Sequence, residues 1–546
     1  MSAITGNAPM EERALFVRKA TGLVKGWSVR DAFIYSAFSI NIVTLGLYAF
    51  SYGPFIPKGS LLWAVILSGA YLVFQAVTYA SLIAAMPRAG GDYVWMSRVL
   101  GGGIGFVIAV CGWWFILWHW VPIYANVLNG EVFSPLAAIV GWDGGVSFFG
   151  KPEGLFTSSM IVAFAASVLI GLGMRTYARF QKICFYGGVI ALAIVIVLLA
   201  VHSKNDFISS FNSQSHKVYG TTGDAYAATL KAGNAHVASI GSFAFGSVIL
   251  LIPFLFFFNL WSNWGATLYG EVRGASDFRK NIMAMGGALL ATSAVGAILL
   301  LLFAHTFGWQ WYNAANNAYW GQVYGYVKSA PVAAFPYPGL FAAFFFHNAV
   351  LQFIVVGLMS LWFFGWMGSI FLSSTRVVFA TAFDRVLPEW TAKVSRKGVP
   401  YPALALMLIP SIPISYFYAY NSFGGKFDQW TLDATLVIAI TFFGSAVAAA
   451  ILPWRKPEIY NASPIAKYRV LGLPLITVAA LGFMVILGYA LYKWFQDSVY
   501  GVNNHSSLWY MGALYLLALL IYVGSRIYRR TQGVDLGMVY KEIPVE

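Results

Sequence analysis

The chemistry-bearing residues of this chain are hydroxyl and amide side chains set within apolar runs. The sequence contains no His-Glu-x-x-His motif, no closely spaced Cys/His set, no Walker-type loop and no Ser/His/Asp set with an exposed base. Its two cysteines, Cys111 and Cys184, lie inside apolar stretches, which is typical of small buried hydrophobic residues. The sequence therefore favours a binding site over a catalytic one, and it predicts no metal and no cofactor.

Two long apolar runs carry hydroxyl and amide side chains near their middles. In the run that begins near residue 32, these side chains are Ser36, Ser39, Asn41 and Thr44. In the run that ends near residue 270, they are Asn259, Ser262 and Asn263. For any one of these residues, hydrogen bonding to a neighbouring helix is the alternative explanation. The occurrence of both clusters favours a shared site.

A helix inside a lipid bilayer can lose its regular turns only where the opened backbone lines a cavity. The N–H groups at the start of a half-helix attract a carboxylate, and freed carbonyl groups attract an amine or a cation. Two interrupted helices would therefore hold a small zwitterion between them, and the sequence predicts such a site at the two polar clusters.

The composition indicates that these runs lie in a membrane. Of the 546 residues, 59% are hydrophobic and 10% are charged, whereas a soluble domain carries about 25% charged residues. A spanning helix takes about 20 apolar residues, and the sequence predicts an all-α integral membrane protein with 12 transmembrane helices. The expected spans are 32–50, 61–86, 104–130, 155–174, 183–202, 240–270, 282–308, 340–374, 402–420, 433–454, 470–495 and 507–529.

The distribution of charge agrees with this topology. With 12 spans, both termini and all of the arginines fall on one side, which the positive-inside rule assigns to the cytoplasm. The net charge of +14 then reflects basic residues that contact anionic lipid and does not indicate a nucleic-acid-binding surface. No charged residue lies near the middle of a span, and Asp31, Glu131 and Asp433 are expected at span ends. This pattern argues against a proton pump and a voltage sensor.

Three motifs follow the second, sixth and eighth expected spans. They are Pro87 with Gly90, Gly91 and Tyr93; Gly270, Glu271 and Val272; and Arg376 with Asp384, Leu387 and Pro388. Their order, spacing and side of the membrane resemble those of the amino acid–polyamine–organocation superfamily, the amino acid permeases, over about residues 25–455. We expect Asp92, Arg98, Asp384 and Arg385 to form salt bridges at the inner surface, where they would hold conformations of an inner gate.

The resemblance implies a five-plus-five inverted repeat in which helices 1 and 6 are broken, with two further peripheral helices. The expected organisation is an N-terminal cytoplasmic tail (1–30), a first repeat (31–202), an extracellular loop (203–239), a second repeat (240–455), two peripheral helices (456–530) and a C-terminal cytoplasmic tail (531–546). The outer segments 203–239 and 309–339 are expected to cap the extracellular face.

The resemblance also implies where a substrate would bind. The family usually has a Gly-Ser/Ala-Gly segment where this chain has Asn41–Thr44, so polar side chains would assist the backbone here. The family's aromatic gate falls near Phe257, and Asn263 occupies a position where some acid-dependent members carry glutamate. The expected substrate-binding residues are Ser36, Ser39, Asn41, Thr44, Trp118, Phe257, Asn259, Leu260, Trp261, Ser262 and Asn263.

Ion coupling is open from the sequence, with H⁺ and Na⁺ as the candidate ions. Gly187 and Gly188 stand where proton-coupled relatives can use a lysine. Ser369 and Ser373, four residues apart on one helix face, could ligate Na⁺ or simply bond back to their own helix. His119 could relay protons or serve as a structural hydrogen-bonding group. An exchanger or a uniporter would need no coupling ion.

The resemblance therefore implies a secondary active transporter of amino acids or related amines in the plasma membrane, working by alternating access. The alternatives are an ion-independent exchanger and a membrane-embedded enzyme, and we expect no enzymatic activity. The expected partners are the substrate and the lipid bilayer, with no nucleic acid and no obligate protein partner. A channel is disfavoured because the sequence lacks repeated filter loops.

Overall fold

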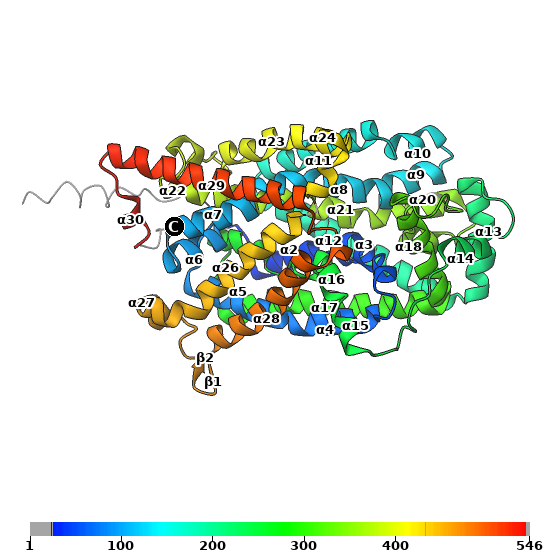
Figure 1. Cartoon of the computed structure of the whole chain (residues 1–546), viewed down its shortest axis with the longest axis horizontal. Helices are drawn as coiled ribbons and strands as arrows, with labels where there is room; N and C mark the ends of the chain where they lie inside the picture. Colours follow the sequence, from blue (N-terminus) through cyan, green and yellow to red (C-terminus); the bar gives the residue numbers. More distant parts are fainter. Residues whose placement is uncertain (1–22, 24–25, 333, 432, 542–546) are drawn as a thin grey trace, which may run out of the picture.

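The computed structural model describes residue 23 and the ranges 26–332, 334–431 and 433–541. The described chain is almost entirely helical (Figure 1), and its two-stranded hairpin pairs β1 (Arg469–Val470) with β2 (Leu473–Pro474) in antiparallel register. Eleven of its helices are long and apolar enough to cross a membrane, which supports a multi-pass membrane protein.

The elements follow one another in three groups, in which η marks a π-helical or 3₁₀-helical turn. The first group is α2 (Val29–Ile40), η1 (Ile42–Gly46), α3 (Leu47–Phe50), η2 (Gly53–Phe55), α4 (Leu61–Tyr71), α5 (Val73–Ala85), α6 (Gly91–Val99), α7 (Gly102–Val110), η3 (Cys111–Phe115), α8 (Leu117–Leu128), η4 (Asn129–Phe133), α9 (Ser134–Ile139), α10 (Asp143–Phe149), α11 (Pro152–Gly171) and α12 (Met174–Val201). The second group is α13 (Lys204–Tyr219), α14 (Ala225–Gly233), α15 (Phe245–Ile249), α16 (Ile252–Asn259), η5 (Trp264–Glu271), α17 (Phe278–Phe303), η6 (Ala304–Gly308), α18 (Trp309–Val323) and α19 (Pro338–Ala343). The third group is α20 (Ala349–Met359), α21 (Leu361–Met367), α22 (Ser369–Phe383), η7 (Glu389–Ala392), α23 (Tyr401–Ala419), α24 (Ser422–Gly425), α25 (Phe427–Thr431), α26 (Asp433–Arg455), α27 (Pro457–Ala462), α28 (Leu475–Gln496), η8 (Ser498–Tyr500), α29 (His505–Thr531) and α30 (Leu536–Val539).

Eleven of the twelve expected spans correspond to the eleven long helices. The remaining one, 240–270, is divided into α15, α16 and η5, and none of these pieces is long enough to count as a spanning helix. Helix boundaries also differ from the expectation. The third span extends to Ile139, and the eighth runs from Ala349 to Phe383. The expectation that Arg376 follows the eighth span was therefore wrong, because this residue lies within α22.

The bundle has two distinct ends (Figure 1). We call the end with α6, α27 and α30 the basic end, and the opposite end with α13, α14 and α18 the cap end. The segments expected as capping loops are largely helical. The indole of Trp311 on α18 stacks on Tyr226 of α14 and donates to its carbonyl oxygen over 3.1 Å. Aromatic stacking thus joins the two segments into one cap.

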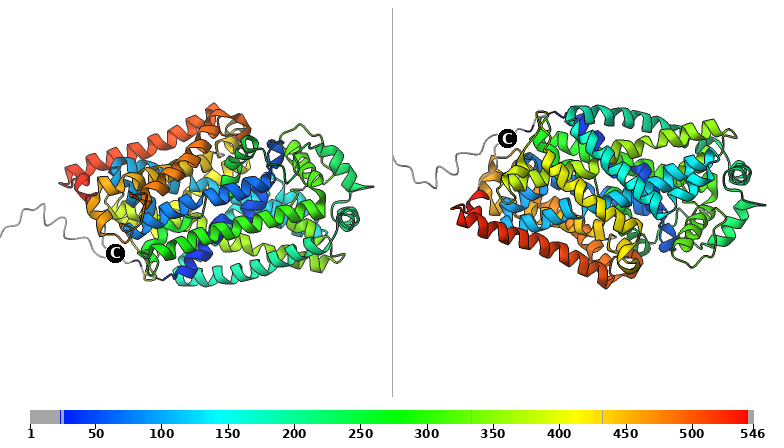
Figure 2. Two further views of the ribbon diagram at one scale, coloured as in Figure 1. Left: turned by 90° about the horizontal axis from the view of Figure 1, so that it is seen from below. Right: turned by 90° about the horizontal axis from the view of Figure 1, so that it is seen from above.

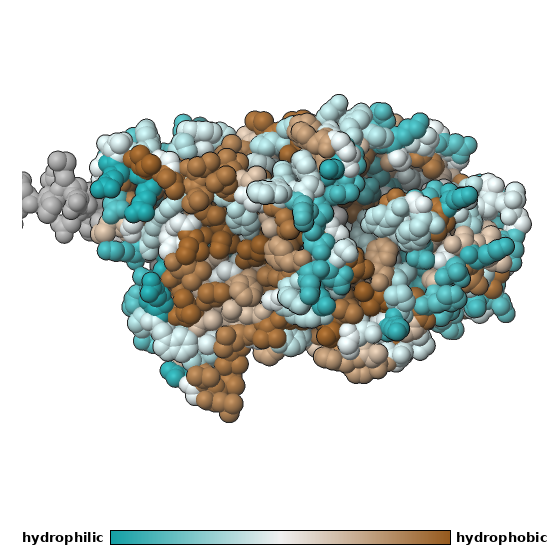
Figure 3. All heavy atoms as spheres, in the orientation of Figure 1, coloured by the Kyte–Doolittle hydropathy of each residue, from teal (hydrophilic) through white to brown (hydrophobic). Residues whose placement is uncertain are grey.

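Apolar side chains cover the sides of the bundle. Ile190 on α12 is 59% exposed and Leu520 on α29 is 60% exposed, and α29 lies along an outer edge in both views of Figure 2. Figure 3 shows apolar atoms gathered over the region of α26, α28 and α29, while the cap end is mainly hydrophilic. Such an exposed apolar belt is suited to lipid and not to water.

At the basic end, the turn after the second span folds tightly against the rest of the bundle. Gly90 has φ of 93°, which an L-residue with a side chain rarely adopts. Its N–H donates to the carbonyl oxygen of Thr267 over 2.9 Å. A Cβ at Gly90 would also collide with Ala380. The glycine therefore allows this turn to contact η5 and α22 closely.

A buried ion pair joins α6 to the end of α22. The two guanidinium nitrogens of Arg98 donate to the two carboxylate oxygens of Asp384 over 2.5 and 2.8 Å, and Tyr93 donates to the same carboxylate over 2.9 Å. The expectation of a salt bridge was correct for Arg98 and Asp384. Within the described ranges, neither Asp92 nor Arg385 forms an ion pair.

Asp92 is instead held by uncharged donors. The hydroxyls of Tyr79 and Ser445 each lie 2.6 Å from its Oδ1, and the indole of Trp113 lies 3.0 Å from its Oδ2. Burial raises the pKa of Asp92 to about 6, and the three hydrogen bonds partly oppose this rise. Asp92 thus joins the second, third and tenth spans without a counter-ion, which is why the expected salt bridge is absent.

We predict that Asp384→Asn strongly destabilises the fold. Removing one partner of a buried ion pair leaves the other charge uncompensated, which costs about 3–5 kcal/mol. The measurement is the melting temperature of the purified protein in detergent. Lys280→Gln is the control, because the Lys280–Asp277 pair is exposed and such pairs contribute at most about 1 kcal/mol. Equal melting temperatures for the two variants would contradict the prediction.

We predict that Asp92 makes the stability of the fold depend on pH. Because its pKa is raised in the folded state, the folded chain binds a proton more readily than the unfolded chain, and stability falls as pH rises from about 3.8 to about 6. The melting temperature should fall over this range in the wild type. In Asp92→Asn, which carries no ionisable group at this position, the fall should be smaller. An identical pH profile in both proteins would show that Asp92 does not titrate as expected.

Candidate functional site

The first span is interrupted at Asn41. Helix α2 ends at Ile40, and Asn41 adopts the left-handed conformation with φ of 47° and ψ of 78°. Its Oδ1 accepts a hydrogen bond from the N–H of Thr44 over 3.1 Å, and its Nδ2 donates to the carbonyl oxygen of Trp362 over 3.1 Å. Asparagine tolerates this conformation better than most residues other than glycine. One asparagine therefore ends α2, starts η1 and links both to α21.

The single glycine near this interruption allows close packing. Gly46 ends the π-helical turn η1, and a Cβ there would lie 3.2 Å from the ring of Phe258 and 2.8 Å from Ile42. Gly46 therefore lets the first span approach α16 of the sixth.

The sixth span is interrupted just after Asn259. Helix α16 ends there, residues 260–263 form a turn, and η5 continues as a 3₁₀ helix. Gln75 of α5 compensates for the lost helical hydrogen bonds: its Nε2 donates to the carbonyl oxygen of Leu260 over 2.7 Å and to Oδ1 of Asn263 over 2.9 Å. Ser262 donates to its Oε1 over 3.4 Å. The sequence analysis did not identify Gln75, although it is the only amide side chain in 61–86.

Several polar atoms at the two interruptions are buried and have no protein partner. Asn259 donates to Ser68 over 2.6 Å, but its Oδ1 accepts nothing. The Nδ2 of Asn263 and the Oγ1 of Thr44 are likewise unpaired. Buried polar atoms in proteins nearly always have partners, so these three atoms have hydrogen-bonding capacity available for a ligand. A free amide N–H₂ suits a carboxylate, and a free carbonyl oxygen suits an ammonium group.

An aromatic layer lies on the cap side of the sixth-span interruption. The indole of Trp120 stacks on Phe257, with ring centroids 5.7 Å apart, and meets Trp261 edge-on at the same distance. Beyond Phe257, a cavity of about 170 Å³ lies between the cap-side ends of several spans, and Tyr48 and Tyr52 also line it. Phe257 therefore lines this cavity and also contacts Trp120, which does not line it.

Trp118 lies apart from this layer. Its indole donates to the carbonyl oxygen of Leu406 over 3.0 Å and so faces α23. His119 also faces away, since its Nε2 lies 2.6 Å from the hydroxyl of Tyr510 on α29 and its ring stacks on Phe427. The structure thus brings Trp120, which the sequence analysis did not select, to the position expected of Trp118.

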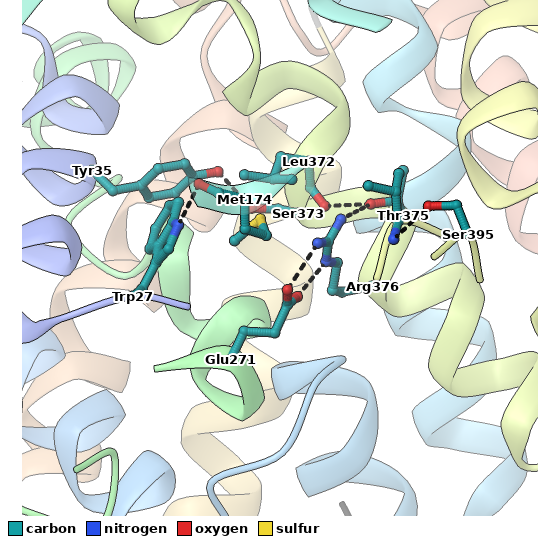
Figure 4. Close-up of polar contacts among 10 residues, drawn as sticks. Trp27, Tyr35, Met174, Glu271, Leu372, Ser373, Thr375, Arg376 and Ser395 are labelled. Atoms are coloured by element: carbon teal, nitrogen blue, oxygen red, sulfur yellow. Dashed lines mark hydrogen bonds and ion pairs between the residues drawn. The ribbon is translucent and has the colours of Figure 1, made fainter. Parts of the chain in front are cut away.

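Ser373 connects α22 to both interrupted spans (Figure 4). Ser373 donates to the carbonyl oxygen of Trp264 over 2.9 Å, and its Oγ lies 3.0 Å from the hydroxyl of Tyr35. The Oγ of Ser369 lies 3.3 Å from the hydroxyl of Tyr177 on α12. Both hydroxyls are therefore engaged with other helices. Of the first-span serines, Ser39 bonds back to the carbonyl oxygen of Tyr35 over 2.8 Å, and Ser36 is buried.

A second buried ion pair lies at the basic end, below Ser373 in the view of Figure 4. Arg376 of α22 donates to the two carboxylate oxygens of Glu271 over 2.7 and 3.1 Å. The carbonyl oxygen of Glu271 accepts from the N–H of Trp27, and the N–H of Arg273 donates to the carbonyl oxygen of Trp27. The ion pair therefore fixes the end of the sixth span to α22, and the two backbone hydrogen bonds fix it to the chain that leads into the first span.

Comparison with known proteins agrees with this arrangement. The amino acid permease family model matches residues 32–521. The chain is 22% identical over 464 residues to Asc-type amino acid transporter 1 of Mus musculus, which covers 82% of this chain and 74% of the relative. It is 23% identical over 482 residues to the branched-chain amino acid permease BcaP of Lactococcus lactis subsp. cremoris (strain MG1363), covering 85% of each.

Both relatives are named for the transport of amino acids. The family match covers the larger part of the chain and includes both interrupted spans and the basic-end motifs. The chain therefore belongs to the amino acid permease family, within the amino acid–polyamine–organocation superfamily.

Proposed function

We propose that this protein is a secondary active transporter that moves neutral amino acids across the plasma membrane by alternating access. The observation that carries the proposal is the pair of interrupted spans whose buried polar atoms have no protein partner. A polar group in a membrane interior without a partner is costly. A ligand that supplies the missing partners would recover that cost.

In the proposed binding mode, the zwitterion lies between the two interruptions. Its carboxylate accepts from Nδ2 of Asn263 and from the hydroxyl of Thr44, and its ammonium group donates to Oδ1 of Asn259. The half-helix that starts at Ile42 adds the partial positive charge of its N-terminus. Neither 36–46 nor 257–267 contains a charged side chain, so the site supplies no counter-charge for a charged substrate side chain.

The aromatic layer favours an apolar substrate side chain. Trp120, Trp261 and Phe257 present ring faces and edges around the sixth-span interruption. One relative is named for branched-chain amino acids, which carry such side chains. We therefore extend the proposal to small or branched neutral amino acids as the first substrates to test.

The two ends of the bundle would open alternately. On the cap side, Phe257 lines the cavity of about 170 Å³ and stacks on Trp120. On the basic side, the Arg98–Asp384 and Arg376–Glu271 pairs hold the helices together. We assign the basic end to the cytoplasm by the positive-inside rule. Ser369, Ser373 and His119 stay candidates for Na⁺ or H⁺ coupling, and ion-independent exchange is the alternative.

We expect purified protein in proteoliposomes to take up radiolabelled neutral amino acids. Uptake should saturate and should be inhibited by unlabelled substrate, because a transporter has a finite number of sites. Liposomes without protein provide the background. If no amino acid or amine is bound or moved, the proposed function is wrong. Turnover of a lipid substrate in detergent without a gradient would favour a membrane-embedded enzyme.

We expect Asn263→Ala to weaken substrate binding without unfolding the protein. Loss of a hydrogen bond to a charged group costs about 1.5–3 kcal/mol, so KM for uptake should rise by roughly 10-fold to 100-fold. The matched control is Asn205→Ala, since Asn205 is exposed on α13 of the cap. Wild-type KM in Asn263→Ala, with an unchanged melting temperature, would remove Asn263 from the site.

A further inference from the structure

Glu131 is a buried carboxylate that neither the ion pairs nor the proposed binding site uses. It lies in the π-helical turn η4 and is 0% exposed. Neither of its carboxylate oxygens has a hydrogen-bond partner, and no described lysine, arginine or histidine forms an ion pair with it. The sequence analysis placed it at a span end, but the third span continues to Ile139 and encloses it.

Two tyrosines lie in the electrostatic environment of this carboxylate. Glu131 interacts electrostatically with Tyr312 on α18 and with Tyr337, which precedes α19. Burial and the Glu131 carboxylate together raise the pKa of Tyr337. The hydroxyl of Tyr337 is buried and has no hydrogen-bond partner. The hydroxyl of Tyr312 is buried and interacts with the side chain of Asn316, whose Nδ2 donates to the carbonyl oxygen of Tyr312. The two side chains that interact with Glu131 therefore carry hydroxyls and not basic groups.

The neighbouring elements offer no counter-charge. The titratable groups on the helices packed against η4 are His119 and Tyr124 on α8 and Asp143 on α10, and α9 has none. His119 is engaged with Tyr510. Lys204 of α13, which packs against α9, lies over the ring of Tyr226. A buried carboxylate without a partner costs several kcal/mol, so its charge must be neutralised from solution.

The turn that carries Glu131 is connected to the aromatic layer. The position that a side chain at Gly130 would take lies 3.4 Å from Cβ of Phe335. Phe335 stacks on Tyr48 of the first span with centroids 5.2 Å apart, and Tyr48 contacts Phe257 with centroids 5.7 Å apart. Trp120, which stacks on Phe257, lies on α8 directly before η4. A change in η4 can therefore reach Phe257 from two sides.

We propose that Glu131, together with Tyr312 and Tyr337, forms a site for one monovalent cation, H⁺ or Na⁺, whose binding is linked to transport. A π-helical turn is frequently found at a functional position, and carboxylate, hydroxyl and amide oxygens are the ligands that hard cations prefer. The linkage rests on the proposed transport function, whereas cation binding itself does not.

The first experiment measures cation binding without transport. The melting temperature of the full-length chain in detergent is recorded in NaCl and in choline chloride, and over a range of pH in an Asp92→Asn/Asp433→Asn background. Asp433 is replaced because it is another buried carboxylate whose two oxygens have no hydrogen-bond partner. A Na⁺ site predicts a higher melting temperature in NaCl than in choline chloride, because binding to the folded state alone stabilises it. A proton site predicts a melting temperature that rises as pH falls, with no effect of Na⁺.

Glu131→Gln should abolish whichever response the parent protein shows, because the amide is neutral at all pH values. It should not lower the melting temperature below that of the unoccupied parent, since it removes a buried charge. Glu153→Gln is the matched control, because Glu153 is exposed at the start of α11. The proposal is overturned if the parent responds to neither ion, or if Glu131→Gln keeps the response of the parent.

The second experiment measures linkage in proteoliposomes. Concentrative uptake driven by a Na⁺ or H⁺ gradient should fall about tenfold or more in Glu131→Gln, while exchange of labelled for unlabelled substrate is retained. Unchanged gradient dependence in this variant would contradict the linkage alone. If the wild type moves no substrate, the proposed function fails, and the melting-temperature experiment still decides whether Glu131 binds a cation.

Discussion

Every backbone N–H and carbonyl group inside a bilayer needs a partner, and the arrangement of this protein follows from that requirement. At the first interruption, Asn41 supplies both an acceptor for the chain that follows and a donor to α21. At the second interruption, Gln75 supplies a donor to the carbonyl oxygen of Leu260. Side chains from neighbouring helices thus replace the helical hydrogen bonds. The polar atoms that they leave unpaired define the binding site.

At the basic end of the bundle, buried charged groups likewise have partners. Its two buried pairs both use α22, which contributes Arg376 and ends at Asp384. Each guanidinium makes two hydrogen bonds to the carboxylate that it faces, a geometry in which the attraction best offsets the loss of hydration. Because Ser373 of α22 contacts both interrupted spans, this helix connects the binding site to the closed end.

The sequence predicted where the helices would break, because clustered amide side chains are unusual within an apolar run in a membrane and need hydrogen-bonding partners there. It could not identify Gln75 as the compensating donor, since that role depends on how the second and sixth spans pack together. It also selected Trp118 where the structure places Trp120. Successive residues of an α-helix are rotated by about 100°, so residues two apart face opposite directions, and only the packing decides which of them faces the site. Burial of Glu131 followed from the length of a helix whose end the sequence did not define.

Asn41 has a mechanical consequence. It is the last cap of one half-helix, the first cap of the next and an anchor to α21, so the joint at the centre of the first span is fastened to the eighth. Gln75 fastens the joint of the sixth span to the second in the same way. Each interruption is thereby hydrogen-bonded to a neighbouring helix. When either interrupted helix tilts, the neighbouring helix must move with it as one rigid body. Otherwise the hydrogen bond from the Asn41 or Gln75 amide must break first.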